Sequence, residues 1–401
     1  MRVGILTREY PPEVYGGAGV HVEYLTRELA RRIDVAVHCF GAPRASPLVA
    51  AAYQPWTALA GGRPEDGALE AMSVDLAMAR ALAGVDLVHS HTWYTNLAGH
   101  LAKLLWDVPH VCTTHSLEPL RPWKEEQLGG GYSLAVFCER TALESADAVI
   151  AVSEAMRRDV CTCYPAVDPA RVHVIHNGID AGEYRPDRST DALTPHGIDP
   201  SRPLVVFVGR ITRQKGLTHL LRSAPAIDRS AQLVLLASAP DTPEIAAEVR
   251  DLYEDARAAG VSIVWIDRAV SRATVIQALS HATVFVCPSI YEPFGLVNLE
   301  AMACEAAVVA SAVGGIPEIV ADLETGYLVP CSVDAGETDD GAALRFTEAL
   351  TERINQLIAN PGLAADLGRA GRRRVLERFT WEAVAARTLE LYGSLGTSVA
   401  G

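Results

Sequence analysis

Short apolar runs alternate with amphipathic stretches from the first residues of the chain. The opening run at 2–7 is followed by a stretch at 19–31 with helical spacing and by a second apolar run at 35–40. Further runs lie at 85–89, 109–113, 147–152 and 172–175. Continuously apolar runs of this length are typical of parallel strands covered by helices on both faces. The first half therefore predicts a parallel β-sheet built from β-α-β units.

The alternation starts again after HNGID at 176–180 and a stretch rich in Pro and Asp that ends at Arg202. Strands are expected at 204–209, 233–237, 261–266, 282–289 and 306–311, with helices at 243–259 and 271–281. This second half also reads as a doubly wound α/β domain. We expect an α/β fold with domains at 1–190 and 191–380 facing a central cleft, and a C-terminal helix and tail at 381–401 that cross back.

Composition and charge narrow the class of protein. The 401 residues are 49% apolar and 21% charged, which is typical of a globular protein. The net charge of −14 argues against nucleic-acid binding over a broad basic face. The eight cysteines are scattered without a CxxC pair, so we expect free thiols. Because a signal peptide and a run of about 18 apolar residues are both lacking, we expect a cytoplasmic protein without a membrane span.

A glycine-rich loop follows the first expected strand, in TREYPPEVYGGAGVHVEYL. Gly16, Gly17 and Gly19 lead into a helix, where backbone N–H groups and the helix dipole favour an anion. The spacing is not the GxGxxG of nicotinamide-binding proteins. The loop therefore indicates a phosphate site, with an ordinary turn as the alternative.

A second candidate anion site opens the second half of the chain. Its first strand runs directly into Arg210 and Lys215, in GRITRQKG. A guanidinium and an ammonium at the carboxyl end of a parallel strand suit a diphosphate, although a solvated loop would also carry such charges. Since the sequence has no DxD pair, these cations rather than a metal would neutralise the diphosphate.

The third feature is the run SIYEPFGLVNLEAM, in which seven residues separate Glu292 from Glu300. The backbone amides of Phe294, Gly295 and Leu296 open the following helix and are expected to face a ligand. Such carboxylates are usually charged groups on the protein surface. The apolar sequence around Glu300 indicates instead that its carboxylate forms hydrogen bonds.

In this order, the three motifs resemble those of the retaining family-4 glycosyltransferases of the GT-B fold. The run HSLEPLRPWKEEQLGGGY at 115–132 is similar to the actinobacterial, glycogen-synthase-like branch of that family. The resemblance implies front-face transfer, in which the acceptor attacks on the side that the diphosphate leaves and the departing phosphate takes the proton. The resemblance also implies that this transfer requires neither a metal ion nor a cofactor.

The resemblance also implies roles on the donor side. Arg210 and Lys215 would neutralise the diphosphate as it leaves, and Gly17, with Gly16 beside it, would contact the same phosphates. Glu300 would bind the donor ribose.

Around the donor sugar, Glu292 would lie near O3 and His115 would lie beside the reaction centre. The amides of Phe294, Gly295 and Leu296 would bind sugar hydroxyls and phosphate.

Fewer residues are predicted to bind the acceptor. Tyr94, Ser116, Arg121 and Lys124 are candidates to bind the acceptor, since a phosphorylated acceptor needs cations. The alternative is that the two cations only pair with neighbouring glutamates. Bacterial glycogen synthases typically have Asp where this chain has Thr92. The histidines of HSHTW at 89–93 are expected to organise the cleft rather than to bind metal.

The function implied is transfer of glucose from ADP-glucose to glucose 1-phosphate, which forms α-maltose 1-phosphate for α-glucan synthesis. Elongation of glycogen from ADP- or UDP-glucose is the alternative, and a GT-B sugar-nucleotide epimerase is a more remote one. The partners are thus a nucleotide sugar and a sugar phosphate or α-glucan. The sequence is compatible with a homodimer but carries no signal for oligomeric state.

Overall fold

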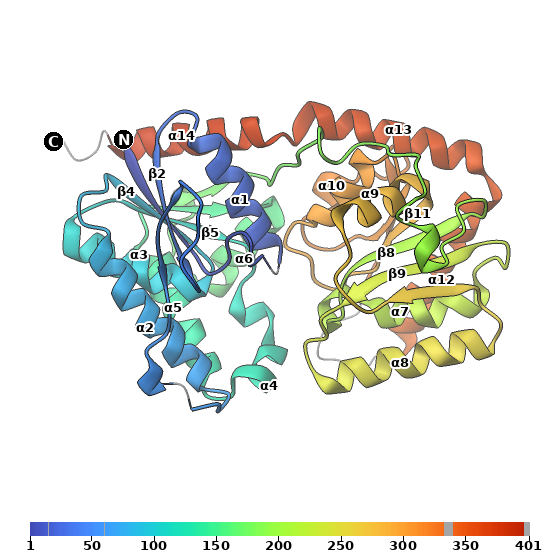
Figure 1. The fold of residues 1–401 in the computed structure, drawn as a ribbon, viewed down its shortest axis with the longest axis horizontal. Helices are drawn as coiled ribbons and strands as arrows, with labels where there is room; N and C mark the ends of the chain where they lie inside the picture. The colour runs from blue at the N-terminus through green and yellow to red at the C-terminus, as the bar shows by residue number, and fades with distance from the viewer. Residues whose placement is uncertain (15, 60, 333–339, 397–401) are drawn as a thin grey trace. The chain divides into compact units, whose positions relative to one another are not determined.

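The computed structural model describes residues 1–14, 16–59, 61–332 and 340–396, and it contains two α/β units (Figure 1). Unit 1 comprises Met1–Gly178 together with the chain from Trp381 onward, and unit 2 comprises Ile179–Thr380. The division falls before the expected boundary at 190 because the connecting segment already bonds to unit 2. The Asp187 N–H, for example, donates to Ser280 Oγ at 2.9 Å. Residues 397–401 of the expected tail lie outside the described residues.

Unit 1 holds a seven-stranded parallel sheet in the order β3-β2-β1-β4-β5-β6-β7. Its strands are β1 (Arg2–Thr7), β2 (Asp34–Phe40), β3 (Val49–Tyr53), β4 (Leu87–His91), β5 (His110–Thr114), β6 (Ala148–Ala151) and β7 (Val172–Val174). Its helices are α1 (Gly17–Leu29), α2 (Asp66–Ala81), α3 (Trp93–Trp106), α4 (Glu125–Leu128), α5 (Gly131–Ser145), α6 (Glu154–Cys163) and α14 (Trp381–Gly396).

The C-terminal helix α14 completes the core of unit 1. Trp381 stacks on Tyr24 of α1 with 5.6 Å between ring centroids, and Tyr392 is fully buried. Both belong to the apolar cluster that includes Val3 and Ile5 of the central strand β1. The chain therefore returns to unit 1 after finishing unit 2, as expected of the C-terminal helix that crosses back.

Unit 2 holds a six-stranded parallel sheet in the order β10-β9-β8-β11-β12-β13. Its strands are β8 (Leu204–Arg210), β9 (Gln232–Ser238), β10 (Ile263–Ile266), β11 (Ala282–Cys287), β12 (Val308–Ser311) and β13 (Gly326–Val329). Its helices are α7 (Leu217–Ser223), α8 (Pro243–Ala258), α9 (Arg272–His281), α10 (Leu296–Ala303), α11 (Ile316–Ile319), α12 (Asp340–Ala359) and α13 (Pro361–Arg378).

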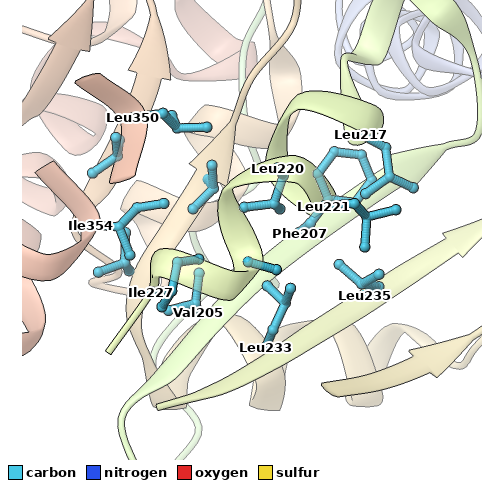
Figure 2. Packing of buried hydrophobic residues seen from close by; sticks show 14 of the residues in the cluster. Val205, Phe207, Leu217, Leu220, Leu221, Ile227, Leu233, Leu235, Leu350 and Ile354 are labelled. Carbon is cyan, nitrogen blue, oxygen red and sulfur yellow. The ribbon is translucent and has the colours of Figure 1, made fainter. Parts of the chain in front are cut away.

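One apolar cluster fixes the start of unit 2. Leu220 and Leu221 of the short helix α7 are buried in the same cluster as Val205 of β8, Leu235 of β9 and Ile354 of α12 (Figure 2). A seven-residue helix is too short to be stable alone, so this packing holds it in place. The loop between β8 and α7, which carries Lys215, is thereby anchored at both ends.

Two edge strands and several strand boundaries differ from the sequence pattern, the boundaries by one or two residues. The pattern did not predict β3 and β13, which lie at the outer edges of their sheets. The expected strand at 85–89 is shifted to β4 because its histidines are compatible with a buried strand. His89 bonds through Nδ1 to the Tyr392 hydroxyl at 2.6 Å and through Nε2 to Thr113 Oγ1 at 2.7 Å, which satisfies both ring nitrogens.

Both sheets reverse their strand order next to the first strand of the unit, between β1 and β4 in unit 1 and between β8 and β11 in unit 2. Ligands of doubly wound proteins bind outside the carboxyl ends of the strands at this switch point. The predicted residues of each unit follow these strands, which explains why motifs distant in sequence meet within one unit.

Candidate active site

The two predicted cations of unit 2 lie at the carboxyl end of β8. Arg210 is the last residue of the strand and forms an ion pair with Asp241. Lys215 ends the 3₁₀ turn Arg213–Lys215, and its N–H donates to Thr212 Oγ1 at 3.2 Å. The structure thus brings the predicted pair to the carboxyl end of the strand. Arg210 also lies near enough to oppose the charge on Lys215.

The ammonium of Lys215 is bound to the carboxylate of Glu292. Lys215 Nζ donates to Glu292 Oε2 at 2.6 Å, and the Ser289 hydroxyl donates to the same oxygen at 3.2 Å. Burial disfavours the charge on Lys215, but the Glu292 carboxylate and Cys287 together outweigh this effect and raise the pKa of Lys215 above its ordinary value. The lysine is therefore charged at neutral pH. The glutamate is 7% exposed and has its charge balanced by Lys215.

Glycines allow the loops that carry this pair to approach one another. A Cβ on Gly216, which has φ +63°, would lie 2.0 Å from the Pro288 carbonyl oxygen. A Cβ on Gly314, with φ +52°, would lie 1.9 Å from the carbonyl oxygen of Glu292. Only glycine fits such positions, because a larger residue would meet backbone that cannot swing aside. The spacing of Lys215 and Glu292 thus depends on Gly216, the last residue of the GRITRQKG motif, and on Gly314, which no motif indicated.

The expected amides and Glu300 lie on and before α10. Gly295, with φ +104°, is the N-cap of this helix, and Leu296 is its first residue, so their amides lie at its positive end. Phe294 is buried against Phe379, with ring centroids 6.2 Å apart, so its ring has a packing role. Burial raises the pKa of Glu300 to about 7, although a hydrogen bond with Tyr184 and the charge of Arg272 oppose the shift.

In unit 1, the glycine-rich loop already binds a carboxylate of the protein. The Gly16 N–H donates to Glu9 Oε2 at 2.7 Å, and a Cβ on Gly19 would lie 2.7 Å from the same oxygen. Gly17 begins α1 and is exposed. An N–H group at the helix N-terminus therefore binds an acceptor oxygen, which is the interaction that the predicted phosphate site would use. In this structure that oxygen belongs to Glu9.

His115 belongs to a group of packed imidazoles. His115 Nε2 and His91 Nδ1 are 3.1 Å apart, and the ring of His21 lies edge-on to His115 with 4.7 Å between centroids. The His89 ring is 4.2 Å from the His91 ring. Burial lowers the pKa of His21 to about 4 and lowers the pKa values of His91 and His115 well below their ordinary value. The cluster is therefore uncharged at neutral pH.

The acceptor candidates Tyr94, Ser116 and Arg121 lie on and beside the ends of β4 and β5. Arg121 Nη1 donates to Ser116 Oγ at 2.9 Å and to Glu118 Oε1 at 3.0 Å. A cation that the sequence analysis missed, Arg8, lies over the Tyr94 ring at 4.0 Å from its centroid. Both guanidiniums act on Tyr94 and oppose the rise that burial causes in its pKa. Arg121 thus pairs with Glu118, as the alternative interpretation of this cation expects. A second arginine, Arg8, lies beside Tyr94.

Lys124 and Thr92 complete the predicted set. Lys124 Nζ donates to Gln127 Oε1 at 2.6 Å. Thr92, between β4 and α3, has φ +67° and ψ 162°. That region is almost restricted to glycine, and such strain concentrates at functional sites. In the sequence, Thr92 was notable only because bacterial glycogen synthases typically have Asp there. Nothing in the sequence predicted its unusual backbone conformation.

The chain matches known proteins over nearly its whole length. Glycosyltransferase Family 4 matches residues 15–183, and Glycosyl transferases group 1 matches residues 190–374. An alpha-maltose-1-phosphate synthase of Mycolicibacterium smegmatis is 53% identical over 98% of this chain and 99% of its own. The synthase of the same name from Mycobacterium tuberculosis is 52% identical over the same shares.

The chain is also similar to a solved structure over nearly its whole length. Sucrose-phosphate synthase from Thermosynechococcus elongatus aligns with a TM-score of 0.75 and 25% identity, and 99% of each chain is covered. Among the described helices, none is long and apolar enough to cross a membrane. The resemblance inferred from the motifs is confirmed: the chain belongs to the GT-B glycosyltransferase family that contains the alpha-maltose-1-phosphate synthases.

Proposed function

We propose that the chain transfers glucose from ADP-glucose to the 4-hydroxyl of glucose 1-phosphate, with retention, and so forms α-maltose 1-phosphate. The observation that carries this proposal is the 53% identity to a synthase of that product over nearly the full length of both chains. We further propose a cytoplasmic enzyme of α-glucan synthesis.

On the donor side, Arg210 and Lys215 supply the charge that the leaving diphosphate needs. Both cations sit at one strand end, and the raised pKa of Lys215 keeps its ammonium charged throughout the neutral range. Fixed cations lower the barrier when they stabilise charge that develops in the transition state. The departing phosphate then removes the proton from the acceptor hydroxyl. In this proposal no metal and no dedicated base are required.

On the acceptor side, Arg8 and Arg121 give unit 1 two guanidiniums around Tyr94. Guanidinium groups bind phosphate through paired N–H donors, which suits a sugar phosphate better than a neutral glucan. Ser116 adds a hydroxyl bonded to Arg121. We therefore favour glucose 1-phosphate over the end of a glycogen chain as the acceptor.

A product assay tests the proposal directly. Labelled ADP-glucose is supplied with glucose 1-phosphate or with glycogen, and the products are identified by NMR. Formation of α-maltose 1-phosphate with glucose 1-phosphate supports the proposal. Label that enters glycogen, with no disaccharide phosphate formed, would assign the chain to polymer elongation and reject the phosphate acceptor.

Two variants locate the acceptor phosphate. Arg8→Gln and Arg121→Gln should each raise the KM for glucose 1-phosphate at least tenfold, because a charge-assisted hydrogen bond contributes about 1.5–3 kcal/mol. The KM for ADP-glucose should change much less. Arg80→Gln, at an exposed position near the end of α2, is the matched control. Equal KM values for glucose 1-phosphate in all three variants would contradict the assignment.

A further inference from the structure

Three histidines from separate elements of unit 1 converge on one point. His21 comes from α1, His91 ends β4 and His115 follows β5. One ring nitrogen from each lies within 4.8 Å of the other two. His91 Nδ1 and His115 Nε2 are already 3.1 Å apart. A tetrahedral zinc ion with Zn–N bonds of about 2.1 Å holds its nitrogens about 3.4 Å apart, so the cluster needs only small ring movements to reach that spacing.

One of the nitrogens that could bind the ion is buried and has no hydrogen-bond partner among the described residues. It is Nε2 of His21, on a side chain that is 2% exposed. Buried polar atoms are normally satisfied, because an unpaired one costs about 1–3 kcal/mol. The hydrogen bonds within unit 1 therefore leave room for a ligand that accepts electron pairs from imidazole.

The hydrogen bonds of His21 determine which of its ring nitrogens can bind an ion. His21 Nδ1 is bonded to Asn177 Oδ1 at 2.7 Å, which assigns its proton to Nδ1 and leaves Nε2 as the ligand atom. An outer hydrogen bond of this kind orients metal-binding histidines in proteins. His115 is partly exposed and gives an ion access to the buried rings.

We propose that His21, His91 and His115 form a binding site for one zinc ion, with a water molecule as the fourth ligand. Three neutral imidazoles suit zinc and related transition metals and do not suit magnesium or calcium, which prefer oxygen. The ion has no part in the proposed transfer. Zinc bound to His115 occupies the ring expected beside the donor sugar, so zinc inhibits the enzyme reversibly.

Zinc titration of the chelator-treated full chain, followed by calorimetry, tests the site without reference to activity. The wild type should bind one ion tightly, and His21→Gln should weaken binding at least tenfold. Asn177→Ala should weaken it about 10- to 100-fold, because it removes the outer hydrogen bond. The control is His173→Gln, on the exposed face of β7. Equal affinity in the wild type and all three variants would overturn the proposal.

A second measurement requires no variant and is unaffected if one fails to fold. The zinc absorption edge of the one-to-one complex should show a four-coordinate ion with three imidazole ligands. A spectrum with sulfur ligands would assign the ion to a cysteine instead and would also overturn the proposal. Inhibition of transfer by zinc, reversed by a chelator and weakened in His21→Gln, would support the site further.

Discussion

Replacing Lys215 with methionine separates two contributions of its ammonium, because Met keeps most of the side-chain length and removes the charge. In the resting protein the ammonium balances Glu292 at 2.6 Å. During turnover, in our proposal, it stabilises the leaving diphosphate. Loss of the first contribution lowers the stability of unit 2, and loss of the second lowers kcat. The two effects are measured independently.

The pair geometry sets the size of each effect. Removing one partner of a buried ion pair costs about 3–5 kcal/mol, and because Lys215 is 25% exposed we expect about 2–3 kcal/mol. For a unit of this size, that change lowers the Tm by about 5–10 °C. Loss of one fixed group that stabilises transition-state charge should lower kcat about 100- to 1,000-fold.

The double variant Lys215→Met with Glu292→Gln distinguishes the two effects. It removes both charges, so most of the stability measured by thermal unfolding should return. The rate of product formation from ADP-glucose should remain at least as low as in Lys215→Met. Glu292→Gln alone is the control for the contribution of Glu292 to the rate. If the double variant recovers the rate of Glu292→Gln alone, Lys215 serves only to balance Glu292 and its role in catalysis is refuted.

Three further predictions concern single positions. Burial raises the pKa of Glu300 to about 7, and two ribose hydroxyls would favour its carboxylate form. The affinity for ADP should therefore rise from pH 6 to 8, and binding should release a proton. Calorimetry in two buffers measures both effects and should find neither in Glu300→Gln. Thr92→Gly should stabilise the chain by about 1 kcal/mol in denaturant unfolding, because strain of about 1–3 kcal/mol is relieved and glycine entropy offsets part of it. Gly216→Ala should abolish most transfer activity, because its Cβ meets the Pro288 carbonyl, whereas Gly67→Ala, which meets no atom within 4 Å, should leave activity unchanged.

Apolar periodicity predicted the sheets well because their central strands are buried on both faces. The pattern failed at β3 and β13, two of the four edge strands of these sheets. β3, with the sequence VAAAY, is mostly half-buried, and alanine carries little strand signal. β4 was shifted because its HSH end reads as polar, although the Tyr392 hydroxyl, about three hundred residues later, satisfies His89. Long-range partners of this kind cannot be read from local periodicity.

In the candidate site, too, some residues could be predicted from the sequence and others could not. Motif spacing identified Arg210, Lys215 and Glu292, which the fold brings to one end of the unit 2 sheet. It did not identify Arg8, because an arginine after a strand has no distinctive neighbours in sequence. Nor did it identify the convergence of His21 with His115, since that contact joins residues far apart in sequence. Residue types are local information, whereas convergence depends on packing.

Four of the groups expected to bind phosphate share one property in this structure, namely a carboxylate partner. Asp241 pairs with Arg210, Glu292 with Lys215 and Glu118 with Arg121, and Glu9 accepts the Gly16 N–H. A phosphate that binds at these groups must share or displace an anion already present, so its net binding free energy is smaller than the number of contacts suggests. A bound phosphate gains most from these cations as its charge grows, because the carboxylates are fixed competitors of constant charge. The same pairing that limits ground-state affinity therefore favours the diphosphate while it leaves, when a transferase needs the cations most.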